Sequence, residues 1–298
     1  MTTRPEILCI GSVLWDVIGR TASSMRVGSD VPGRITRLPG GVAMNIAMTL
    51  RRLDMTPAIL TAIGTDPAGE ELVAETAAMG IITDFAYRSA DLPTDVYMAI
   101  EGGNGLIAAI ADAHSLEAAG AKILRPLEDG RLGSLDDPYA GPVALDGNLT
   151  EDLLRVIARS PAFAAADLRV APASPGKAAR LMALRHHPTA TLYVNLEEAS
   201  ILCQAEFTSS EAAALALIAQ GARRALVTDG GSSASDAIAG GPVITLAPPT
   251  VQVVRVTGAG DTFMAAHIVS ETRGADREAA LARALRAAAT YVSGEVPL

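Results

Sequence analysis

The feature of this sequence that most constrains its fold is a regular alternation between short apolar, strand-forming runs and longer, alanine-rich helical runs. The strand-like runs are residues 7–10, 58–63, 141–145, 191–194 and 225–228, and the helical runs are 43–53, 70–79, 153–158, 177–185, 211–220, 262–270 and 278–291. A strand–helix–strand rhythm is typical of a mostly parallel sheet with helices on both faces. We therefore predict an α/β protein built on one central sheet.

Two segments, residues 13–38 and 94–112, break this rhythm because they are poor in helical pattern. In the second segment, residues 96–100 alternate with a period of two, and Gly-Gly-Asn-Gly at 102–105 predicts a tight turn before the next apolar run. We expect both segments to supply antiparallel strands of a small sheet that projects from a single domain covering residues 1–298.

The composition and charge of the chain argue against several classes of protein. The 298 residues, 49% of them apolar, are enough for a substantial core, and a net charge of −9 predicts repulsion from the phosphate backbone of a nucleic acid. No apolar run approaches the roughly 20 residues of a membrane span, and the first residues lack the pattern of a secretion signal. Cys9 and Cys203 lie in apolar surroundings, which predicts buried thiols. We expect a cytoplasmic protein with neither a membrane nor a nucleic acid as partner.

The motif with the strongest chemical content is Val-Thr-Gly-Ala-Gly-Asp-Thr-Phe at 256–263, which follows a strand-like run at 251–254 and opens a helical run. Its glycines allow backbone N–H groups to converge on one point, and the positive end of the helix favours an anion there. Asp261 would repel phosphate but is well placed to accept the proton of an attacking hydroxyl, so it is our candidate catalytic base. A helix N-cap beside a glycine turn accounts for the same pattern.

A second glycine motif, Pro-Gly-Gly-Val-Ala-Met-Asn at 39–45, leads into a helix. Gly40 and Gly41 permit close approach of a ligand to the backbone, and Asn45 both donates and accepts hydrogen bonds, as sugar hydroxyls require. Asp16 follows the first strand, at the sheet edge where open α/β folds bind ligands. Ordinary helix capping and a solvated loop acid are the alternative explanations.

Together these motifs resemble the two signatures of the ribokinase-like (PfkB) carbohydrate kinase family. The similarity covers nearly the whole chain and includes Ile-Gly-Thr-Asp at 63–66, Asn-Leu-Glu-Glu at 195–198 and Thr-Asp-Gly-Gly at 228–231. It implies a ribokinase-like fold, whose small β-sheet lid closes over the sugar and pairs with the lid of a second copy in a homodimer. It also implies ATP and Mg²⁺ as cofactors and is compatible with a monovalent cation as a further one.

The resemblance implies a role for each matching residue. Asp261 matches the catalytic base, and Asn195 and Glu198 match a motif that holds Mg²⁺ and phosphate through water, which suits a cation that dehydrates reluctantly. The remaining matches are Gly258, Ala259 and Gly260 for the anion hole, Asp16, Gly40, Gly41, Asn45 and Asp112 for the acceptor, and Thr228, Gly230 and Thr257 for the nucleotide.

Within the family the chain most resembles the pseudouridine kinases, on residues 32–35, 110–112, 145–149 and 173–177. Five positions depart from the expected pattern: Met44 replaces an arginine, Ala171 an aspartate, Tyr193 a lysine and Ser233 a glycine, and Arg255 stands where many members carry an acid. We expect several of these changes near the substrate or nucleotide pocket, where they bear on the choice of acceptor more than on the reaction.

These features predict an ATP-dependent kinase that phosphorylates the primary hydroxyl of a ribosyl group, with pseudouridine as the favoured acceptor. A free-sugar kinase acting on ribose, fructose or a keto-deoxy sugar acid is an alternative of the same class. A non-catalytic sensor of sugars or nucleosides is an alternative of a different class, because a fold alone does not determine function. The intact segment 258–261 argues against a sensor, since binding alone does not need Asp261.

Overall fold

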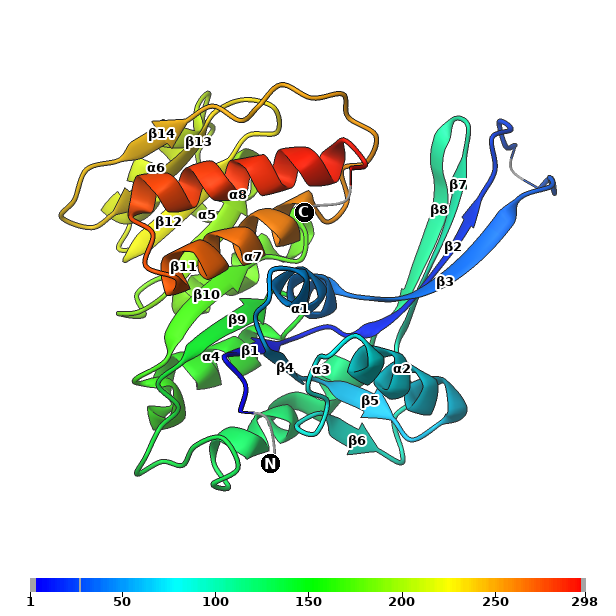
Figure 1. Ribbon diagram of the computed structural model, residues 1–298, viewed down its shortest axis with the longest axis horizontal. Coiled ribbons are helices and arrows are strands. Elements are labelled where there is room, and N and C mark those ends of the chain that lie inside the picture. Colours follow the sequence, from blue (N-terminus) through cyan, green and yellow to red (C-terminus); the bar gives the residue numbers. More distant parts are fainter. Residues whose placement is uncertain (1–3, 27, 296–298) are drawn as a thin grey trace.

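The computed structural model describes residues 4–26 and 28–295. Its centre is an eight-stranded sheet in the order β14-β13-β12-β11-β10-β9-β1-β4 (Figure 1). The strands are β1 Ile7–Ile10, β4 Pro57–Leu60, β9 Pro142–Asp146, β10 Asp167–Ala171, β11 Thr191–Asn195, β12 Arg224–Thr228, β13 Ala234–Ile238 and β14 Ile244–Leu246. All neighbours from β4 to β12 pair parallel, and β13 and β14 extend the edge antiparallel. The predicted α/β class and mostly parallel sheet are therefore confirmed.

Helices cover both faces of this sheet (Figure 1). One face packs against α1 (Val42–Arg52), α7 (Ala259–Thr272) and α8 (Arg277–Val292), and the other against α4 (Glu151–Arg159), α5 (Leu196–Cys203), α6 (Ser210–Ala219) and the 3-10 segment η3 (Pro175–Leu184). The remaining elements are β5 (Ala62–Gly64), α2 (Pro67–Ala78), β6 (Tyr87–Ser89), α3 (Ser115–Ala119), η1 (Gly120–Leu127) and η2 (Pro161–Phe163). The inner strands are apolar throughout because both of their faces are buried.

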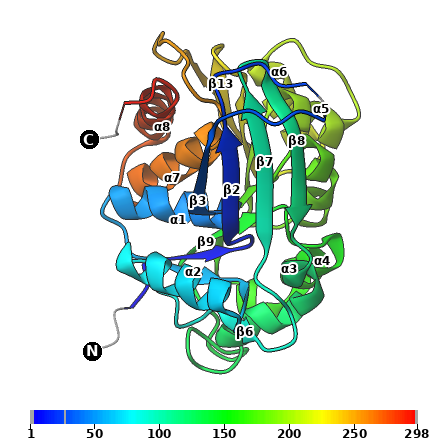
Figure 2. The same cartoon turned by 90° about the vertical axis from the view of Figure 1, so that its right-hand side faces the viewer.

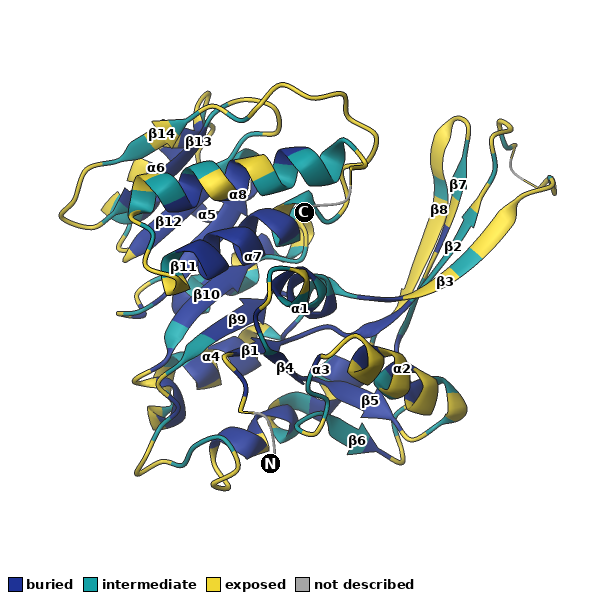
Figure 3. Cartoon of the chain, in the orientation of Figure 1, coloured by how far each residue is buried: buried dark blue, intermediate teal, exposed yellow. Residues whose placement is uncertain are grey.

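A separate four-stranded sheet projects from this body, and we call it the lid sheet (Figures 1 and 2). It consists of β2 (Leu14–Arg20), β3 (Arg34–Gly40), β7 (Val96–Gly102) and β8 (Gly105–Asp112), in the order β3-β2-β7-β8. Figure 3 shows that its surfaces are far more exposed than those of the central sheet. One pairing differs from the expected antiparallel arrangement: β2 and β7 are parallel, which the long connection between them allows.

Three local predictions need correction. Residues 251–254 form no strand and lie in an exposed loop, because Pro248 and Pro249, which lack N–H donors, separate them from β14. The run at 58–63 divides into β4 and β5, and the expected helix at 177–185 is the 3-10 segment η3. Within residues 4–26 and 28–295, none of the helices combines the length and apolar character that crossing a bilayer demands.

Candidate active site

The predicted site residues gather around the carboxyl-terminal edge of the parallel strands. From β1 the chain turns to β4 on one side and later to β9 on the other, so the strand order reverses beside β1. In open α/β sheets, ligands bind in the crevice that such a reversal leaves. The helix N-termini of α1 and α7 and the base of the lid sheet meet near this edge (Figure 1).

Asp261 lies in the first turn of α7, where it does not serve as the N-cap. The N-cap is Gly258, and the Oδ2 atom of Asp261 accepts a hydrogen bond from Asn45 Nδ2 at 3.0 Å. Burial, reinforced by the negative charges of Asp146 and Glu198, raises the pKa of Asp261 to about 7. The capping alternative is excluded, and the carboxylate has the proton affinity that suits a general base at neutral pH.

The glycine segment before Asp261 offers backbone donors, though not from every residue predicted. The N–H of Ala259 donates to the Val256 carbonyl at 3.0 Å and is therefore occupied. Within the described part of the chain, the N–H groups of Gly260 and Asp261 have no acceptor, and space is open beside Gly260. Free N–H groups at a helix N-terminus are an anion site, so the donors here come from Gly260 and Asp261 more than from Ala259.

Asn45 and its glycines are placed by α1. Gly41 is the N-cap of α1 with a φ of 94°, and a Cβ there would lie 2.4 Å from the Ser12 carbonyl oxygen. This position therefore requires glycine. A Cβ on Gly40 would lie 2.1 Å from the Asp16 carboxylate. Asn45 lies one turn inside the helix and uses its side chain on Asp261, which excludes a capping role.

Asp16 is a strand residue and not a solvated loop acid. It lies in β2 at the base of the lid sheet, and burial raises its pKa to about 6. Among residues 4–26 and 28–295, no donor reaches its carboxylate within hydrogen-bonding distance. A partly buried carboxylate with free acceptor atoms is suited to bind hydroxyl groups.

Asn195 and Glu198 form a capping box at the start of α5. Asn195 Oδ1 accepts from the Glu198 N–H, and Glu198 Oε2 accepts from the Asn195 N–H, both at 2.8 Å. Burial raises the pKa of Glu198 to about 7. In the described residues, no three His, Cys, Asp or Glu side chains are grouped as a metal cage. Burial is the main cause of both raised pKa values and neighbouring carboxylates add to it, so a nearby cation would stabilise the charged forms of Glu198 and Asp261.

The other predicted residues lie around this centre without direct contacts to Asp261. Thr228 ends β12 opposite Asn195 in the register, and Gly230 follows in a left-handed conformation beside open space. Thr257 is exposed, and its carbonyl accepts from Tyr291 Oη at 2.8 Å. Asp112 is exposed at the end of the edge strand β8.

Asp146, at the end of β9, has a clear structural function. It is fully buried, and it accepts hydrogen bonds from the N–H groups of Ser12 at 2.8 Å, Ala43 at 3.0 Å and Asn148 at 2.7 Å. These bonds join the ends of β1 and β9 to the start of α1. Asp146 therefore positions the backbone that carries Asn45, and the signal for this was an aspartate ending a buried strand.

Three of the five departures from the family pattern lie in the core. Met44, Ala171 and Tyr193 are 0%, 8% and 5% exposed and belong to the cluster between the sheet and α1, α7 and α8. Arg255 stacks on the Tyr291 ring at 3.9 Å, and the Ser233 carbonyl accepts from Ser210 Oγ at 2.7 Å. Neutral residues at the three core positions are consistent with their burial.

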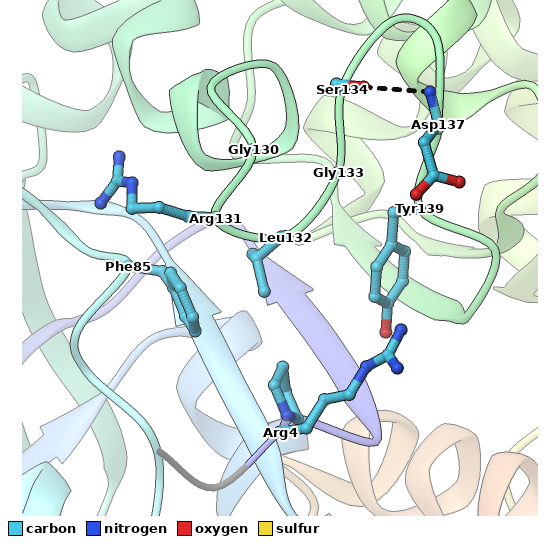
Figure 4. A pocket seen from close by; sticks show the side chains of 10 residues that line it. Arg4, Phe85, Gly130, Arg131, Leu132, Gly133, Ser134, Asp137 and Tyr139 are labelled. Atoms are coloured by element: carbon cyan, nitrogen blue, oxygen red, sulfur yellow. Dashed lines mark hydrogen bonds between the residues drawn. The ribbon is translucent and has the colours of Figure 1, made fainter. Parts of the chain in front are cut away.

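A surface hollow lies at the opposite, amino-terminal edge of the sheet (Figure 4). Arg4, which precedes β1, and Tyr139, which precedes β9, point toward one another there, and Phe85 lines another side. None of the predicted site residues lines this hollow.

Comparison with known proteins identifies the family. Residues 4–295 match the pfkB family of carbohydrate kinases. The chain is 28% identical to pseudouridine kinase of Escherichia coli (strain K12), over 89% of this chain and 83% of that protein, and 28% identical to ribokinase of Bacillus subtilis (strain 168), over 96% and 92%. The structure of Arabidopsis thaliana ribokinase complexed with ribose and ATP superposes with a TM-score of 0.76 at 21% identity, covering 97% of this chain and 93% of that one. The chain thus belongs to the pfkB family of carbohydrate kinases, phosphotransferases that act on a hydroxyl group.

Proposed function

We propose that this kinase transfers the γ-phosphoryl group of ATP to the primary hydroxyl of the ribosyl group of pseudouridine. The observation that carries the proposal is the Asp261 carboxylate, which has a pKa of about 7, is held by Asn45 and lies beside the unoccupied N–H groups at the start of α7. Proton acceptor and anion site are the two parts that phosphoryl transfer to a hydroxyl requires.

In this mechanism Asp261 accepts the proton of the acceptor hydroxyl as its oxygen attacks phosphorus. Asn45 orients the Asp261 carboxylate, and the N–H groups of Gly260 and Asp261 stabilise charge on the transferred group. Asp16 and Asn45 bind acceptor hydroxyls, with Gly40 and Gly41 allowing close approach. Thr228, Gly230 and Thr257 are proposed for the nucleotide side, and Asp112 for the lid side of the acceptor pocket.

Mg²⁺ is the proposed metal, and it would neutralise phosphate charge when bound. Glu198, whose pKa is raised to about 7 and whose Oε2 alone is used in the capping box, would hold it through water together with Asn195. A monovalent cation is a further proposed cofactor.

The choice of acceptor rests on the relatives of the chain. The 28% identity to a pseudouridine kinase supports a nucleoside acceptor. The equally similar ribokinase supports a free sugar. Met44, Ala171 and Tyr193, which replace charged residues expected in the pseudouridine branch, are buried in the core and favour neither acceptor.

Competition kinetics tests both levels of the proposal. Purified enzyme with MgATP is assayed for ADP release against pseudouridine, uridine, adenosine, ribose and fructose, and product masses identify which compound gains phosphate. We expect the highest kcat/KM for pseudouridine, because a pocket built for a base leaves polar groups unpaired when the base is absent. A higher kcat/KM for ribose or fructose would contradict the nucleoside assignment and leave the kinase assignment standing. If none of the five compounds gained phosphate, the proposal of a sugar or nucleoside acceptor would be wrong.

We also propose a cytoplasmic homodimer that pairs through the lid sheet. Ile35, Met98, Ile100 and Ile110 are all exposed, and strand alternation and pairing put them on one face of that sheet. A contiguous exposed apolar face of this kind is typical of a protein–protein interface.

A further inference from the structure

A buried polar cluster lies between the central sheet and α7, and the proposed reaction makes no use of it. We call it the α7 cluster, and its members are Arg169, Tyr193, Arg224, Asp236, His267 and Glu271. They come from four adjacent strands, β10 to β13, and from the C-terminal half of α7. His267 and Asp236 are 0% exposed.

The hydrogen bonds at the centre of the α7 cluster join Tyr193 to His267 and to Arg169. Tyr193 Oη lies 2.8 Å from His267 Nδ1, and Arg169 Nη1 donates to the same Tyr193 oxygen at 3.1 Å. Arg224 Nη2 lies 3.5 Å from His267 Nε2, so arginine donors face both the Tyr193 oxygen and the far side of the His267 ring, and the histidine tautomer decides whether Tyr193 Oη or His267 Nδ1 donates in the bond between them. Burial lowers the pKa of His267 to about 4, which keeps the ring neutral.

Charged side chains and aromatic rings surround this bond. Glu271 receives Arg169 on one oxygen at 2.5 Å and Arg224 on the other at 2.7 Å, and Arg224 also pairs with Asp236 at 2.7 Å. The Phe263 ring stacks on His267 and meets Tyr193 edge-on, with centroids 6.4 and 6.5 Å apart. A paired and closely packed cluster of this kind resists sliding of α7 along the sheet.

The position of the Tyr193–His267 bond connects the two halves of the candidate active site. Tyr193 precedes Asn195 by two residues in β11, so the two side chains share a face of the strand. His267 follows Asp261 by six residues in α7, about 9 Å along the helix axis. The bond therefore joins the strand that leads into the Asn195–Glu198 capping box to the helix that carries Asp261.

We propose that Tyr193, acting through His267, is a positioning residue that fixes α7 against β11 and thereby sets the placement of Asp261 relative to Asn195 and Glu198. The proposal rests on the proposed function, in which Asp261 is the base. Tyr193 touches no substrate, and its contribution is to geometry: a displacement of about 1 Å at a reacting group can cost as much as a hundredfold in rate.

Tyr193→Phe tests this by removing one oxygen atom. We expect kcat and the single-turnover rate to fall by about tenfold, while KM for ATP and for the acceptor stays within about twofold, because binding groups are untouched. His267→Leu, which removes the ring nitrogens, should likewise lower kcat and leave both KM values unchanged. His267→Asn, which keeps a group near Nδ1 that can donate or accept, should recover most of the rate. Assays are run well below each variant's melting temperature.

The matched control is Ile157→Val, a fully buried change in α4 on the opposite face of the sheet. It should lower the melting temperature and leave kcat unchanged, which separates lost stability from lost positioning. If Tyr193→Phe and His267→Leu both keep normal kcat, the positioning role is wrong even though Asp261→Asn remains inactive. If instead Asp261→Asn keeps normal turnover, it is the proposed function that fails, so the two failures are distinguishable.

Discussion

At the scale of single residues, the assignment of Asp261 can be tested by an isosteric change. Asp261→Asn keeps a partner for Asn45 but cannot accept a proton, so turnover should fall by about a hundredfold or more with the affinity for ATP nearly intact. Single-turnover kinetics and calorimetric ATP titration measure the two quantities. Near-normal turnover of this variant under conditions where chemistry limits the rate would contradict the role.

The raised pKa of Asp261 also predicts a pH dependence of stability in the ligand-free protein. Its pKa is about 7 in the folded state, against 3.8 for an ordinary aspartate. Between these two values the folded state binds the proton more tightly than the unfolded state does. This contribution to stability is therefore lost as pH rises from about 4 to about 7. Asp261→Asn has no titrating carboxyl group at this position, so its stability does not fall for this reason as pH rises. The variant's melting temperature should therefore rise relative to wild type as pH increases through this window, and a constant difference from about pH 4 to about pH 8 would show that the carboxyl titrates normally.

At the scale of elements, the glycine motif at the start of α1 predicts a steric requirement. Gly41→Ala combines a φ of 94° with a Cβ only 2.4 Å from the Ser12 carbonyl, so it should lower the free energy of unfolding by about 1 to 3 kcal/mol. Denaturant titration measures the loss. The control is Gly176→Ala, where the nearest atom is 4.0 Å from the new Cβ, and it should change stability little; equal effects of both variants would contradict the steric account.

Elements also show what the sequence could and could not predict. The strands β1, β9, β11 and β12 and the helix starts at Gly41 and Gly258 follow from local apolar runs and glycine chemistry, and the structure has them close to where they were expected. The inner strand β10 was missed. The run at 251–254 has strand-forming valines, but no strand among the described residues pairs with it, and Val254 N–H donates instead to the Val292 carbonyl at the end of α8. A local pattern does not show which neighbours the fold supplies.

The site residues, too, include features that the sequence predicted and features that it could not. The motif at 256–263 singled out Asp261 but not its partner, because the Asn45–Asp261 hydrogen bond spans 216 residues. Met44, Ala171 and Tyr193 lie in the core, and their residue types indicate a change of acceptor only if burial is ignored. The capping box of Asn195 and Glu198 is a local pattern with an equally local function, so its spacing alone could not separate a helix start from a metal site.

At the scale of the whole molecule, the exposed apolar face of the lid sheet predicts the oligomeric state. Ile35 and Ile110 are 75% and 69% exposed on that face, and burial in a partner would stabilise a dimer. Sedimentation velocity should show a dimer for the wild type and a monomer for Ile35→Lys combined with Ile110→Lys. The control is Leu135→Lys, equally apolar and 56% exposed in the loop after η1, which should remain dimeric. A monomeric wild type at micromolar concentration would contradict pairing through the lid.

The hydrogen bond between Asn45 and Asp261 has a consequence for the protein during its own synthesis. Asn45 leaves the ribosome early, together with β1 and the first half of the lid sheet, whereas Asp261 emerges 216 residues later, after every strand of the central sheet has been made. A nascent chain can thus assemble most of its acceptor side while it still lacks the base and the backbone donors of α7. Until α7 has emerged, the nascent chain therefore lacks the proposed catalytic base and cannot consume ATP by the proposed route.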